Sequence, residues 1–60
     1  MENKIIDILT NMKIKEYDDN EVLTSMRFLL ANHKLNNEEY NYWCKYKEKF
    51  KQIWKENNKH

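Results

Sequence analysis

The sequence of 60 residues has no glycine, no proline and only one cysteine. Glycine and proline mark the tight turns of β-rich domains, and glycine also forms the loops that hold phosphate groups. The lone thiol of Cys44 excludes an internal disulfide and is typical of a protein in a reducing compartment. We therefore expect a helical, cytoplasmic protein that lacks a phosphate-binding loop.

Long apolar runs are also missing from the chain. No segment approaches the roughly 18 apolar residues that cross a bilayer, and the first residues lack the pattern of a secretory signal. A chain of this length forms one small domain, whose core rarely supplies more than about 3–5 kcal/mol without a disulfide, a metal or a second subunit. We expect a single domain over residues 1–60 that does not enter a membrane.

The charged residues are unevenly placed along the chain. Ten lysines accompany a single arginine, and nine asparagines are present, which is typical of an AT-rich coding sequence such as those of low-GC bacteria and their phages. Residues 1–21 hold three lysines and six acidic residues, whereas residues 44–60 hold six lysines and two glutamates. Although the net charge is only +1, the chain is acidic at its start and basic at its end.

Two hexapeptides, YDDNEV and LNNEEY, repeat one pattern of apolar, capping and acidic positions. In the first, Asp18 stands where a helix N-cap accepts a backbone hydrogen bond, and Glu21 follows three residues later, as in a capping box. In the second, Asn36 and Glu39 have the same spacing. The flanking apolar residues fit a hydrophobic staple, and the carboxylates suit the positive end of a helix dipole. Both hexapeptides therefore predict helix starts rather than a catalytic site.

These two starts divide the chain into three predicted helices, over residues 2–13, 19–32 and 37–57. In each helix, apolar side chains recur at helical spacing and share one face. The residues on these faces are Ile5, Ile6, Ile8, Leu9 and Met12 in the first helix, Val22, Leu23, Met26, Leu29 and Leu30 in the second, and Tyr42, Trp43, Tyr46, Phe50, Ile53 and Trp54 in the third. The predicted fold is an all-α three-helix bundle with a long C-terminal helix, either monomeric or dimeric.

The third predicted helix is longer than its two companions. At a rise of 1.5 Å per residue it extends for roughly 30 Å, against about 18–20 Å for the others. Short connections favour antiparallel packing, so two shorter helices leave part of the long one uncovered. We expect Ile53 and Trp54 to overhang the bundle and expose an apolar patch, which in a soluble chain indicates self-association or a partner.

A set of aromatic, apolar and lysine side chains makes up the predicted partner-binding surface: Phe28, Tyr46, Lys47, Phe50, Lys51, Ile53, Trp54 and Lys55. Phe28 lies off the apolar arc of its helix, so it either anchors a partner or closes the core against the first helix. The three lysines repeat every four residues. They either bind an acidic partner or phosphate, supported by cation–π contact, or form a solvated flank.

A DNA-binding transcriptional regulator is the main alternative, because the second and third predicted helices are spaced as in a helix-turn-helix. In the first turn of the third helix, Asn36, Asn37 and Asn41 suit contacts with adenine. Glu38 and Glu39 would instead face phosphates unfavourably, and the chain is only weakly basic. Nucleic acid is therefore a less favoured partner than protein.

Catalytic and metal-binding groups form no recognised arrangement in the sequence. Cys44, His33 and His60 lack a metal-ligand spacing, and no nucleophile is paired with an oriented base. A membrane-surface role would depend on the same apolar stripe that the core needs. We therefore expect no enzyme activity, metal or cofactor. We interpret the chain as a small bacterial or phage regulator or inhibitor that binds a larger host protein, with a homodimer as a further arrangement.

Overall fold

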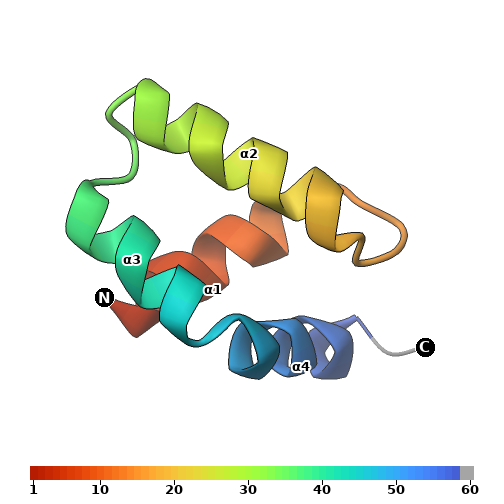
Figure 1. Cartoon of the computed structure of the whole chain (residues 1–60). Coiled ribbons are helices and arrows are strands. Elements are labelled where there is room, and N and C mark those ends of the chain that lie inside the picture. The colour runs from red at the N-terminus through yellow and green to blue at the C-terminus, as the bar shows by residue number, and fades with distance from the viewer. Residues whose placement is uncertain (59–60) are drawn as a thin grey trace.

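A computed structural model describes residues 1–58, which contain four helices and no strand. The helices are α1 (Glu2–Asn11), α2 (Asp19–Ala31), α3 (Asn37–Lys45) and α4 (Lys47–Asn57). They form a body of 33 × 17 × 17 Å (Figure 1). The all-α prediction is confirmed. The three-helix bundle with a long C-terminal helix is wrong, because the third predicted helix is divided at Tyr46.

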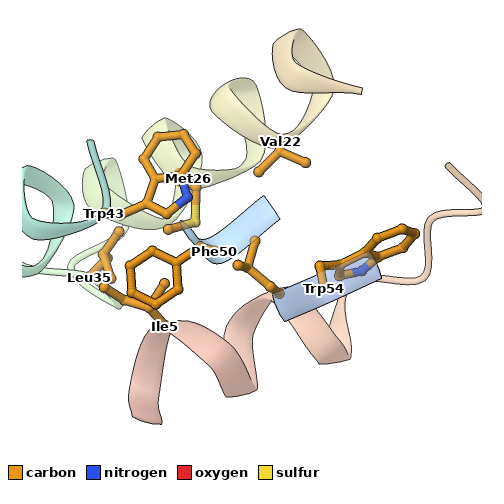
Figure 2. Packing of buried hydrophobic residues seen from close by; sticks show 8 residues of the cluster. Ile5, Val22, Met26, Leu35, Trp43, Phe50 and Trp54 are labelled. Carbon is orange, nitrogen blue, oxygen red and sulfur yellow. The ribbon is translucent and has the colours of Figure 1, made fainter. Parts of the chain in front are cut away.

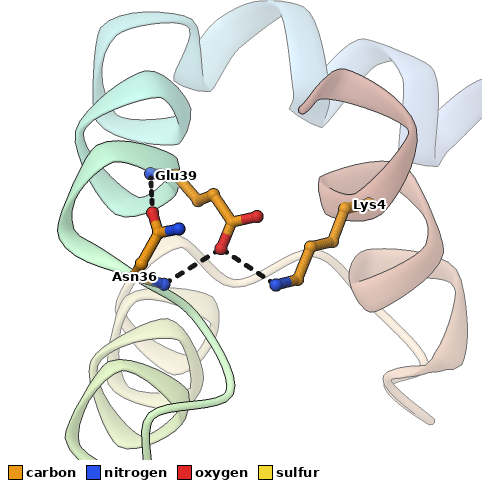
Figure 3. A network of polar contacts seen from close by, with 3 residues as sticks. All are labelled: Lys4, Asn36 and Glu39. Atoms are coloured by element: carbon orange, nitrogen blue, oxygen red, sulfur yellow. Dashed lines mark hydrogen bonds and ion pairs between the residues drawn. The ribbon is translucent and has the colours of Figure 1, made fainter.

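α3 begins with the predicted capping box. The side chain of Asn36 accepts a hydrogen bond from the backbone N–H of Glu39 at 2.7 Å, and Glu39 Oε1 accepts one from the backbone N–H of Asn36 at 3.0 Å. The same Oε1 atom accepts a bond from Lys4 Nζ of α1 at 2.9 Å (Figure 3). The Asn36 N–H and the lysine both favour the charged carboxylate, which lowers the pKa of Glu39. The capping box therefore also ties the start of α3 to α1.

α2 begins at the second predicted N-cap. The Asp18 carboxylate accepts hydrogen bonds from the backbone N–H groups of Asn20 at 2.9 Å and of Glu21 at 3.2 Å. Within the described residues, the Glu21 side chain makes no return bond to the backbone of Asp18. The N-cap prediction is thus confirmed here, and the reciprocal half of the box is not.

α2 ends in a Schellman motif centred on His33. The N–H of His33 donates to Leu30 O at 3.1 Å, and the N–H of Lys34 donates to Leu29 O at 2.9 Å. His33 itself has a φ of 60°, in the left-handed region where glycine is normally preferred. The chain thus reverses direction before α3 without a glycine, and the strain is held by one residue.

α3 and α4 are separated by a single residue, Tyr46, whose φ of −117° and ψ of 34° lie outside the helical region. Its N–H is shared between Tyr42 O and Trp43 O, both at 3.2 Å, and Phe50 N–H donates to Tyr46 O at 3.1 Å. No glycine, proline or side-chain cap bond accounts for this break. We attribute it to tertiary packing, because it turns α4 away from the axis of α3 (Figure 1) and directs Phe50 into the core.

Side chains from all four helices meet in one apolar core (Figure 2). The buried residues are Ile5 and Leu9 of α1, Val22 and Met26 of α2, Leu35 of the α2–α3 turn, Trp43 of α3, and Phe50 and Trp54 of α4. All of them except Leu35 belong to the apolar faces that helical spacing predicts. Within this arrangement α1 packs against α4, α2 against α3, and α3 against α4.

Two ion pairs hold α4 against the first third of the chain. Lys49 pairs with Glu2 of α1, and Lys51 Nζ lies 3.6 Å from Asp19 Oδ2 at the start of α2. The hydrogen bond to Glu2 raises the pKa of Lys49. The basic end of the sequence therefore lies against its acidic start, where opposite charges attract each other.

Candidate functional site

The eight side chains of the predicted partner-binding surface do not form one face. Phe50 is fully buried and Trp54 is only 7% exposed, so neither ring is available to a partner in this fold. Ile53 is half-buried and packs on the same core. The predicted overhang of Ile53 and Trp54 is therefore wrong.

Two features that helical spacing does not predict cover these residues. The break at Tyr46 turns α4 back along α1, instead of letting it extend past the bundle. The segment between α1 and α2 contributes Tyr17, whose ring centroid lies 5.6 Å from that of Trp54 at an interplanar angle of 59°. Partial burial raises the pKa of Tyr17. A tyrosine–tryptophan pair thus replaces the expected exposed patch.

The lysines of α4 lie beside the aromatic core rather than along one free stripe. Lys47 Nζ lies 5.2 Å from the ring centroid of Trp43, and Lys51 Nζ lies 6.0 Å from that of Tyr17. The expected cation–π contacts are therefore present, but they join parts of the same chain. Lys47 and Lys55 also remain exposed to solvent.

Tyr46 is partly exposed, at 37%, and lies at the α3–α4 break. Lys45 Nζ and Lys49 Nζ lie 5.5 and 5.7 Å from its ring centroid, and the ring of Tyr42 packs 4.9 Å away. The Tyr46 ring therefore already has two cations and an aromatic neighbour within its own chain. It does not share a surface with Phe28, which belongs to α2 and lines a groove with α1.

Phe28 is the most exposed large apolar side chain of the described residues, at 67%. It lines a groove of about 500 Å³ between α1 and α2. The lining combines apolar side chains with small or neutral polar ones. These residues are Ile8 and Asn11 of α1, Met12 directly after it, and Thr24, Ser25, Phe28 and Leu29 of α2. We name this feature the α1–α2 groove.

Helical geometry explains why the groove residues are left outside the core. In α2, Phe28 follows the fully buried Met26 by two positions, which places it about 200° around the helix. In α1, Ile5 and Leu9 are buried, whereas Ile8 is only partly buried on the flank of that face. The two flanks face each other across the groove because both belong to helices that share one core.

The α1–α2 groove carries no charged side chain, although 35% of the sequence is charged. A phosphate, an acidic peptide or a nucleic acid would therefore meet no cation among its lining residues. Depletion of charged residues around an aromatic side chain is typical of the centre of protein–protein interfaces. The groove therefore suits an apolar, uncharged part of another protein.

Sequence reasoning identifies Phe28 as a candidate anchor but misses the rest of the groove. One signal is present in the sequence: Thr24 and Ser25 precede Phe28 by four and three residues, so they share its side of α2. Together they form an uncharged strip in a highly charged chain. The contribution of α1 depends on how the two helices meet in space, which this spacing does not determine.

Other chemical functions have little support in the described residues. Residues 1–58 contain no group of three or more His, Cys, Asp or Glu side chains placed to hold a metal ion. Cys44 is a free, half-buried thiol, and His60 lies outside the described residues. None of the four helices is long and apolar enough to cross a bilayer.

No protein-family model, curated protein or solved structure matches the chain.

Proposed function

We propose that this chain is a non-enzymatic protein-binding module, a small bacterial or phage regulator that acts in the cytoplasm. Its target is a larger protein, whose activity or assembly it blocks or modulates. The observation that carries the proposal is the exposure of Phe28 in a groove without charged residues. Buried aromatic anchors supply much of the binding energy of protein interfaces, and an exposed one is available for that role. The lysine-rich, asparagine-rich composition supports the bacterial or phage origin.

A helix of the target protein is the occupant that fits the α1–α2 groove. Two helices supply its lining, and an amphipathic helix lying along them would present anchors at positions i, i+3, i+4 and i+7. These anchors are apolar, to match Ile8, Met12 and Leu29. The side chains beside them are neutral, because Asn11 and Thr24 offer hydrogen bonds but no opposite charge.

DNA binding through α3 has weaker support. Glu39, in its first turn, is already bonded to Lys4 of α1. Lys49 and Lys51 of α4 are paired with carboxylates of the same chain. Phosphate contacts would compete with these ion pairs, whereas strong DNA binding depends on many free cations.

A synthetic amphipathic helix with leucine at i, i+3, i+4 and i+7, and neutral polar residues elsewhere, tests the proposed site. Titrated into the ¹⁵N-labelled chain, it should shift the amide signals of Ile8, Thr24 and Leu29 and leave those of α4 unchanged. Phe28→Ala should weaken binding about tenfold or more, because it removes the anchor. Arg27→Ala, which truncates an exposed neighbour outside the groove, should leave the affinity unchanged.

A second peptide with glutamate at i+3 and i+7 serves as the control for nonspecific apolar binding. It should bind at least tenfold more weakly, because its charges would be desolvated without a partner. Equal affinity of the two peptides, or of the wild-type and Phe28→Ala chains, would refute the groove as the binding site. If the peptide results support the groove, proteins captured from a bacterial lysate by the wild-type chain but not by Phe28→Ala would be candidates for the natural target.

A further inference from the structure

We propose that two copies of this chain exchange α4 by straightening the break at Tyr46 into one continuous helix. α4 of each copy then packs on α1 of the other copy. The partner is a second identical chain, and the contact is the one that α4 already makes within its own chain. The exchange is therefore distinct from the α1–α2 groove and does not depend on it.

The local sequence favours a continuous helix through Tyr46. The segment from Lys45 to Lys49 contains no glycine, proline or N-capping side chain, and its lysines and glutamate are good helix formers. In the structure α4 starts without a side-chain cap bond, so its first backbone N–H groups lack the partners that a cap supplies. A continuous helix would give these N–H groups the carbonyl oxygens of Trp43 and the residues after it.

Tertiary packing favours the break instead. Phe50 and Trp54 are buried in the core that α4 shares with α1. If one isolated chain straightened at Tyr46, both rings would leave this core along the axis of α3 and become exposed. The single chain therefore keeps a break that its local sequence does not favour.

Two copies satisfy both the local preference for a continuous helix and the need to bury the rings of α4. Each straight helix, roughly 30 Å long, extends beyond its own core and lays α4 on α1 of the second copy. There Phe50 and Trp54 enter an identical core, and Lys49 meets Glu2 again. Only one residue changes conformation, from its present φ and ψ of −117° and 34° to helical values. Short hinges of this kind are sites where exchange of an element between identical chains produces dimers.

Two substitutions at the hinge test the exchange by sedimentation equilibrium from micromolar to millimolar concentration. Tyr46→Ala favours the straight helix, whereas Tyr46→Gly disfavours it, and both delete the same ring and its contacts with Tyr42 and Lys45. Because a dimer contains two hinges, the helix propensities predict dimer dissociation constants that differ by about 30-fold. Equal constants, or two chains that stay monomeric at millimolar concentration while circular dichroism shows them folded, would overturn the proposal.

A charge reversal across the α1–α4 contact identifies the exchanged element directly. Glu2→Lys and Lys49→Glu each place like charges at this contact, whether the chain is a monomer or an exchanged homodimer. When the two variants are mixed, exchange of α4 brings opposite charges together at both contacts of the heterodimer. With one variant ¹⁵N-labelled, native mass spectrometry should show heterodimers about 5-fold above the statistical ratio.

The controls separate this exchange from other modes of association. The double variant Glu2→Lys/Lys49→Glu restores the ion pair within one chain, so it should dimerise like the wild type. Phe28→Ala removes the anchor of the α1–α2 groove and should leave the dimer constant unchanged. A statistical mixture of homodimers and heterodimers would show that α4 stays on its own chain, and would overturn the exchange.

Discussion

Two phenylalanines in this chain provide a matched test of the fold, because the same substitution should lower the stability far more at one position than at the other. Phe50 is fully buried between α4 and the rest of the core, whereas two thirds of Phe28 is exposed on α2. Phe50→Ala should lower the free energy of unfolding by about 3–5 kcal/mol, since it removes a buried ring and leaves a cavity. A domain of this size holds only about 3–5 kcal/mol in total. The Phe50→Ala chain should therefore be largely unfolded at room temperature.

Phe28→Ala should behave differently. Full burial of a phenylalanine contributes about 1.5–3 kcal/mol, and only about one third of the Phe28 side chain is buried. The expected loss is about 1 kcal/mol or less, so the chain should remain folded. Phe50→Leu is the intermediate control, with an expected loss of about 1–1.5 kcal/mol because the site keeps most of its apolar volume.

Urea titration at micromolar concentration measures these differences. Far-ultraviolet circular dichroism reports the helices, and fluorescence reports Trp43 and Trp54, which are both buried and should shift to longer wavelength on unfolding. A Phe50→Ala chain that keeps its helices and its wild-type midpoint would refute the arrangement of α4 on α1. So would a Phe28→Ala chain that unfolds as readily as Phe50→Ala.

Two further predictions concern the turns around α3. His33→Gly should raise the free energy of unfolding by about 1 kcal/mol, because glycine adopts the φ of 60° without strain. His33→Ala should not raise it, because alanine has no such advantage. Equal urea midpoints for the two variants would contradict the Schellman assignment. The second concerns Glu39, whose pKa is lowered below its ordinary value of 4.5 by the Asn36 N–H and by Lys4. Its contribution to stability is complete above pH 4.5 and is lost as the pH falls through the lowered pKa, so urea midpoints should decline in that range. Glu39→Gln should flatten this decline, and an unchanged profile would show that other carboxylates cause it.

The helix starts and the core faces could be predicted because short-range chemistry determines them. Asp18 and Asn36 cap α2 and α3 with their own side chains, and no distant residue is needed for those bonds. The buried Ile5, Val22 and Trp43 follow helical spacing, which depends only on neighbours along the chain. These features are local, so the residues next to them along the chain are sufficient to predict them.

The break at Tyr46 could not be predicted for the opposite reason. Its neighbours along the chain favour a helix, and the residue departs from helical geometry because Phe50 and Trp54 find their burial on α1. The cover that Tyr17 provides for Trp54 depends likewise on the path of the α1–α2 connection. Both are long-range effects in which packing overrides local propensity.

This conflict between local and long-range preference also explains where the proposed binding surface lies. If α3 and α4 formed one straight helix in the monomer, the rings of Phe50 and Trp54 would be the exposed apolar surface, and a partner would bind there. Because the break buries them, Phe28 is the most exposed large apolar side chain of the described residues, on the opposite side of its helix from the core-facing Met26. The backbone of Tyr46 therefore determines which apolar surface the chain offers, its own α4 face or the α1–α2 groove. Among the described residues, the broken monomer exposes Phe28 in the groove, and the proposed exchanged dimer would bury the α4 face between copies while leaving both grooves open.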